Sequence, residues 1–112
     1  MGLVLGIDPG TAVTGYGVVS AGRGRDLCLE ECGVIRTSAD ERLPDRSRDI
    51  FMGIQEVIER FEPSAMAVEE VFQGKNVKSA LSLGHARGAI LLAAALQHLP
   101  IAEYSPREVK KA

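Results

Sequence analysis

The sequence lacks tryptophan and has only two cysteines and two histidines among its 112 residues. Cys28 and Cys32 fall in an expected strand, where four residues span about 13 Å, whereas a disulfide tolerates a Cα separation of no more than about 7 Å. No second cysteine pair completes a zinc site, and His85 and His98 fall on different helical faces. We therefore expect no zinc site or internal disulfide, and two small, buried cysteines.

Long apolar runs and a basic N-terminal segment are also missing. The longest apolar run, residues 89–96, is far shorter than the roughly 20 residues of a membrane span. The first residues carry no basic group and reach an acid at Asp8, which is unlike a secretory leader. We expect a cytoplasmic protein that does not associate with membranes.

A surplus of positive charge, common in nucleic-acid-binding domains, is absent too, because the formal net charge is -2. Local basic clusters are nevertheless present. Such clusters are usually solvated surface, so charge alone leaves both a DNA-binding face and an ordinary surface open. The clusters comprise Arg23 and Arg25; Lys75, Lys78 and Arg87; and Arg107, Lys110 and Lys111.

The residues that are present favour one globular α/β domain over positions 1–112, with 46% hydrophobic and 25% charged residues. Apolar runs and turn signals predict strands at 3–8, 15–20 and 27–37, which form an antiparallel meander. Helical periodicity begins at Leu43, with Ser38 or Asp40 as the cap and Pro63 beyond the end. A strand at 65–71, a helix at 76–97, a strand at 101–104 and a helix opening at Pro106 follow.

Two acids stand at strand ends, where open α/β sheets place their functional sites. Asp8 closes the first strand and Glu69 lies near the end of the fourth. Parallel pairing of these strands would bring two costly buried carboxylates together, and a hard divalent cation such as Mg²⁺ would neutralise them. Alternatively, Asp8 caps the turn at Pro9 and Gly10, and Glu69 and Glu70 are solvated charges. Spacing alone leaves both interpretations open.

Two motifs connect the chain to a known family. Residues 5–11 read LGIDPGT and residues 14–18 read TGYGV, while residues 67–72 read AVEEVF and are followed by KN at 75–76 and ARG at 86–88. In this order and spacing they resemble the RuvC-type Holliday junction resolvases, and the likeness extends over the whole chain. The resemblance implies a ribonuclease H-like fold, with a mixed sheet flanked by helices.

The resemblance also implies a structure-specific endonuclease that resolves four-way DNA junctions in recombination and repair by paired, symmetric, metal-dependent nicks. Asp8 and Glu69 would be catalytic ligands of Mg²⁺, with Mn²⁺ as a substitute. Phe72 would insert at the opened junction centre, and Lys75, Asn76 and Lys110 would contact DNA. The family further implies a homodimer, with the helix around Gly84 and Gly88 at its interface, and the RuvA-RuvB branch-migration complex as a partner.

The sequence departs from the family pattern at its end. The family's remaining acids lie in a C-terminal helix, and this chain stops at Lys110, Lys111 and Ala112 before them. We therefore expect a domain incomplete at its C-terminus, without the C-terminal helix, and with slow or absent cleavage.

Two alternative functions stay open. Residues 8–15 also resemble the phosphate-binding hairpin of the actin, Hsp70 and sugar-kinase superfamily, although 112 residues leave no room for that superfamily's second domain. No Walker-type phosphate loop is present. The other alternative is a non-catalytic module that binds junctions and retains vestigial acids.

Overall fold

The computed structural model describes residues 2–10, 12–21, 27–38, 40–70 and 76–104. Five strands and two helices follow one another along these residues in the predicted order: three strands, a helix, a strand, a helix and a strand. The strands are β1 (Leu3–Asp8), β2 (Val13–Ala21), β3 (Leu27–Arg36), β4 (Ala65–Glu69) and β5 (Ile101–Tyr104); the helices are α1 (Leu43–Phe61) and α2 (Val77–Leu96). The helix predicted to open at Pro106 lies outside the described residues.

The strands form one mixed sheet in the order β3-β2-β1-β4-β5. The β3-β2-β1 meander is antiparallel, whereas β4 pairs parallel with both β1 and β5. Parallel neighbours need a crossover, and α1 and α2 provide the connections. The predicted fold class, antiparallel strands followed by parallel strands with flanking helices, is confirmed.

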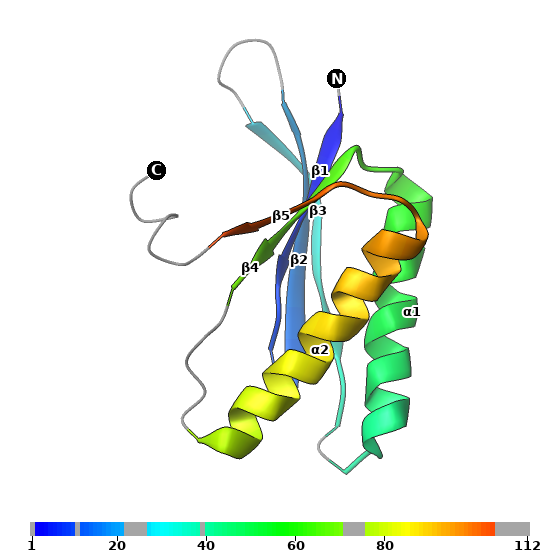
Figure 1. Ribbon diagram of the computed structural model, residues 1–112. Helices are drawn as coiled ribbons and strands as arrows, with labels where there is room; N and C mark the ends of the chain where they lie inside the picture. The colour runs from blue at the N-terminus through cyan, green and yellow to red at the C-terminus, as the bar shows by residue number, and fades with distance from the viewer. Residues whose placement is uncertain (1, 11, 22–26, 39, 71–75, 105–112) are drawn as a thin grey trace.

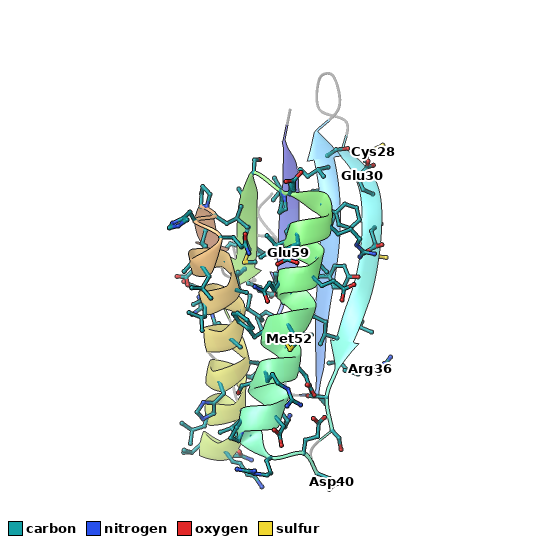
Figure 2. All side chains as sticks on the ribbon, turned by 90° about the vertical axis from the view of Figure 1, so that its right-hand side faces the viewer. Cys28, Glu30, Arg36, Asp40, Met52 and Glu59 are labelled. Carbon is teal, nitrogen blue, oxygen red and sulfur yellow. The ribbon has the colours of Figure 1, made fainter. Side chains whose placement is uncertain are left out.

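Both helices lie on the same face of the sheet (Figures 1 and 2). Leu5, Ile7, Met66 and Val68 point toward them from the two central strands and are at most 1% exposed. Because strand side chains alternate between faces, the intervening residues point the opposite way, toward a face that no described element covers. We call these the covered face and the open face.

On the covered face, Tyr16 of β2 and Glu31 of β3 connect these two strands to α1. The Tyr16 hydroxyl donates to Glu31 Oε2 at 2.9 Å, and Arg60 of α1 forms an ion pair with the same carboxylate. The Tyr16 ring crosses above Gly33, where an added Cβ would lie 2.7 Å from the phenol oxygen. Glycine at this position therefore allows the close approach.

Three sequence-based expectations about these elements are wrong. Helix α1 is capped by Arg42 without a side-chain hydrogen bond, because Ser38 instead accepts from the Asp40 N–H in the preceding loop. Strand β4 ends at Glu69 rather than at residue 71. Both cysteines are exposed. Cys28 lies near the start of the edge strand β3, beyond the end of α1 (Figure 2), whereas Cys32 is in register with Gly17 and points to the open face.

Candidate active site

Asp8 and Glu69 meet at the carboxyl ends of the central strands. Ile7 of β1 is in register with Val68 of β4, so the acids that follow them occupy equivalent positions on adjoining strands about 4.8 Å apart. Ile7 and Val68 are buried on the covered face, and alternation places both carboxylates on the open face. The predicted pairing of the two acids is thus what the strand register produces.

The two carboxylates are less enclosed than the sequence suggested, because Asp8 is exposed and Glu69 half-buried. The pKa of Glu69 is nevertheless raised, first by burial, then by a hydrogen bond with Asp8 and by the Asp8 charge. Two carboxylates this close disfavour ionising together. A bound cation would favour their joint ionisation.

The donor set suits a cation that needs few protein ligands. Within the described part of the chain, no group of three or more His, Cys, Asp or Glu side chains could hold a metal ion. Magnesium commonly takes one or two carboxylates and completes its shell with water and phosphate oxygens. Asp8 and Glu69 fit that pattern and do not form a closed structural metal site.

Tyr104 is a third polar residue at this edge, and sequence reasoning did not identify it as a site residue. It ends β5 in register with Glu69, which places it on the open face too. Burial raises the Tyr104 pKa, and the charges of Glu69 and Asp8 raise it further. Its position at a strand end, like those of Asp8 and Glu69, was the signal that could have identified it.

A cavity of about 290 Å³ opens beside Asp8 on this face. Added Cβ atoms at Gly6, Gly15 and Gly17 would meet their nearest neighbours at 3.7 to 4.0 Å, an ordinary contact distance. Packing among the described residues therefore does not require glycine at these positions, and their small size leaves space next to the acids. The lining comprises Gly6, Asp8, Gly15, Gly17 and Tyr104, together with Ile7 and Tyr16, whose side chains point to the covered face.

Few of the residues expected to contact DNA can be placed. Phe72, Lys75 and Lys110 lie outside the described residues. Asn76 is exposed and caps α2, because its side chain accepts a hydrogen bond from the Ser79 N–H at 2.8 Å. Arg87, a member of one basic cluster, forms an ion pair with Glu103 of β5.

Helix α2 carries apolar residues on two sides. Ala86, Ile90, Ala93 and Ala94 are buried in the core, whereas the outer side exposes Leu81, Leu92 and Leu96 at 52 to 58%. By length and composition α2 could span a membrane, but core helices of soluble proteins pass the same test.

The outer side of α2 borders a groove of about 530 Å³ against α1. The groove is lined by Pro44, Ser47, Arg48, Phe51, Gly84, His85, Gly88, Ala89 and Leu92. His85 therefore lies on the helical side of the molecule and does not join the acids.

Comparison with known proteins assigns the chain to a family. The family model described as crossover junction endodeoxyribonuclease RuvC matches residues 4–112. The RuvC of Moorella thermoacetica is 56% identical over 111 residues, covering 98% of this chain and 65% of the relative, and that of Shewanella amazonensis is 51% identical over 112 residues, covering 100% and 64%. The chain thus spans slightly less than two thirds of these curated relatives.

A solved structure agrees with the sequence comparison. T. thermophilus RuvC in complex with a Holliday junction substrate superimposes with a TM-score of 0.91 at 37% identity, covering 97% of this chain and 69% of the other. The sheet order and the helices on one face are therefore those of the ribonuclease H-like RuvC fold. The chain belongs to the RuvC family of crossover junction endodeoxyribonucleases.

Proposed function

We propose that this protein is a structure-specific endonuclease that resolves four-way (Holliday) DNA junctions by metal-dependent phosphodiester hydrolysis. The observation that carries the proposal is the pairing of Asp8 and Glu69 on adjoining strand ends in a chain of the RuvC family. The T. thermophilus relative was solved with a Holliday junction substrate, which supports the same substrate class here.

Asp8 and Glu69 would be the catalytic residues and would hold Mg²⁺, for which Mn²⁺ could substitute. Their position on the open face leaves a phosphodiester group free to approach. Burial raises the pKa of Glu69 most, and the neighbouring Asp8 carboxyl raises it further; a divalent cation would offset both effects by favouring the ionised pair. When bound, the cation would supply an activated water and neutralise charge on the phosphate. The exposed Asp8 would meet the DNA, and the pairing of β4 with β1 would hold Glu69 beside it.

Phe72, Lys75, Asn76 and Lys110 would contact the DNA around this site. An aromatic ring offers a stacking platform for an unpaired base, and Phe72 follows Glu69 closely in sequence. The lysines and Asn76 would position the backbone without reading sequence. Asn76 fits this role because it is exposed at the N-terminus of α2, where backbone N–H groups favour phosphate.

A homodimer would place two such sites for symmetric nicks, because a four-way junction needs two cuts related by a two-fold axis. The outer side of α2 supports this assembly. Added Cβ atoms at Gly84 and Gly88 would meet nothing within 4 Å, so the backbone of a second helix can approach between Leu81 and Leu92. We expect Leu92→Arg to weaken self-association at least tenfold in sedimentation experiments, with Met52→Arg on the solvent side of α1 as the control (Figure 2).

The cellular setting follows from the family. We propose that the protein acts in the cytoplasm in recombination and repair, together with the RuvA-RuvB branch-migration complex.

The first experiment is a competition gel shift that compares a four-way junction with a linear duplex of equal length. It is carried out in Ca²⁺ at moderate salt, since salt weakens the non-specific phosphate contribution. Selective junction binding is the expected result. Equal affinity for both DNAs would contradict the proposal, and ATP binding would then favour the nucleotide-binding alternative.

The second experiment measures Mn²⁺ affinity by electron paramagnetic resonance. Asp8→Asn and Glu69→Gln each remove one anionic ligand, and we expect each to weaken Mn²⁺ at least tenfold. Glu70→Gln is the matched control, because it makes the same charge change one residue beyond the acid pair. If all variants bind Mn²⁺ like the parent, junction binding without catalysis becomes the better description.

A further inference from the structure

Tyr104 is held beside the acid pair by the backbone pairing of β5 with β4. Strands β4 and β5 pair from Met66 and Ile101 up to Glu69 and Tyr104. The Glu70 N–H then donates to the Tyr104 carbonyl at 2.6 Å, which closes the ladder just beyond the acid. Asp8, Glu69 and Tyr104 therefore end three adjacent parallel strands, one residue on each, and share the open face.

The Tyr104 side chain leans toward Asp8. It lines the cavity beside Asp8 together with Gly15 and Gly17 of β2, although β4 and β1 lie between β5 and β2. It can reach that cavity only by crossing over β4 above the sheet. The glycines beneath leave space for a group that enters from outside.

The Tyr104 hydroxyl has no hydrogen bond to another described residue. A phenol keeps its proton at neutral pH and can donate one hydrogen bond. Asp8 and Glu69 would direct their oxygens to a cation, so a phosphodiester oxygen is the acceptor left for this donor. A neutral donor can meet a phosphate without competing with the cation for the carboxylates.

Building on the proposed function, we infer that Tyr104 is a substrate-binding residue whose hydroxyl donates to a non-bridging oxygen of the DNA phosphate held at Asp8 and Glu69. The residue would thereby fix the position of that phosphate over the cavity. It would not orient the carboxylates, which distinguishes it from a residue that acts through Glu69.

The experiment couples Tyr104→Phe to single methylphosphonate linkages, each of which replaces one non-bridging phosphate oxygen by a methyl group. Junctions carrying one such linkage, stepped across the phosphates at the branch point, are titrated in Ca²⁺ with the parent, Tyr104→Phe and Tyr16→Phe. Tyr16 is the matched control, because it is the chain's only other tyrosine and its hydroxyl bonds Glu31 on the covered face. Mn²⁺ affinity is measured for the same three proteins.

For the unmodified junction we expect Tyr104→Phe to bind about tenfold more weakly than the parent, the size of a lost hydrogen bond to a charged group. At one phosphate, the methylphosphonate should weaken the parent strongly and Tyr104→Phe much less. Mn²⁺ affinity should stay unchanged, and Tyr16→Phe should behave like the parent on every junction.

Equal losses for the parent and Tyr104→Phe at every phosphate would overturn the assignment of Tyr104 while leaving the proposed function intact. A drop in Mn²⁺ affinity comparable to that of Asp8→Asn would also overturn it, since Tyr104 would then act on the carboxylates. If the parent shows no preference for junctions, the proposed function fails, and the role of Tyr104 fails with it.

Discussion

The covered and open faces of the sheet are built from alternate residues of the same strands, and they differ in chemistry. The covered face carries branched or long apolar side chains, such as Leu5, Ile7 and Met66, that are essentially inaccessible to solvent. The open face carries glycines beside Asp8, Glu69 and Tyr104. Because side chains alternate along a strand, one residue can pack in the core and stabilise the domain while the next contributes a side chain to the candidate site. Stability and function should therefore respond to different substitutions.

The largest expected contrast lies between two valines. Val68→Ala removes methyl groups that are fully buried on the covered face, which should lower the free energy of unfolding by about 2 kcal/mol. Val34→Ala makes the same change on the open face, where Val34 is 49% exposed, and should cost less than about 0.5 kcal/mol. Urea unfolding measures both, and equal losses would show that something covers the open face at Val34.

The two tyrosines sharpen the comparison, because each face carries one. Tyr16→Phe removes the hydroxyl that donates to Glu31, so it should cost about 1 kcal/mol of unfolding free energy. Tyr104→Phe should leave stability nearly unchanged in the same urea titration. A larger stability loss in Tyr104→Phe than in Tyr16→Phe would mean that the open-face tyrosine has a structural role.

The pH dependence of stability should reveal the acid pair. Because the folded state raises the pKa of Glu69, it binds a proton more readily than the unfolded chain does. Stability should therefore fall as the pH rises from the ordinary glutamate value of about 4.3 through the raised pKa.

We expect Glu69→Gln to remove this loss. In EDTA at pH 7 the variant should be more stable than the parent, by less than about 1 kcal/mol since solvent screens a half-buried group. The difference should disappear at pH 4. Thermal unfolding at the two pH values measures it, with Glu70→Gln as the control. A parent that gains stability between pH 4 and pH 7 relative to Glu69→Gln would contradict the raised pKa.

The smallest expected effect concerns the cysteines of the edge strand. Cys28 pairs with Ser20 and Cys32 with Gly17 across a register shift in β3, so the thiols point to opposite faces. Both are exposed, and each Cys→Ser change should alter stability by less than about 0.5 kcal/mol. Both thiols should react with a maleimide in the folded protein. Protection of Cys32 alone would indicate that the open face is covered at this strand.

The sequence was sufficient for most of the fold because the hydrophobic period changes where the elements change. Strand β5 has the predicted bounds, Ile101–Tyr104, and α2 begins directly after the predicted start at Asn76, which caps it. The cap of α1 was wrong because Ser38 bonds to its own loop, and Pro44 near the helix start restricts the backbone there. The prediction that both cysteines are buried was wrong, because alternation shows which residues share a face but not whether that face is covered at their position.

The candidate site was predicted in part. Asp8 and Glu69 were identified because each ends an apolar strand, and the parallel pairing of β1 with β4 brought them together. Their catalytic role stays a prediction. Tyr104 also ends a predicted strand, but its place beside the acids depends on β5 pairing with β4, so the strand end alone did not mark it as a site residue. Strand order is decided by long-range packing.

The parallel pairing of β1 with β4 also bears on when the site comes into existence during folding. The Ser64 hydroxyl donates to the Leu3 carbonyl from 61 positions later in the chain, and the acids that follow are separated just as widely. A nascent chain that has formed only the antiparallel meander has Asp8 without Glu69. The chain between Asp8 and Glu69 must first form a closed loop, at an entropic cost, before these two carboxylates can share a cation. If Asp8 and Glu69 have the proposed role, incompletely folded copies would have no assembled site with which to cut DNA.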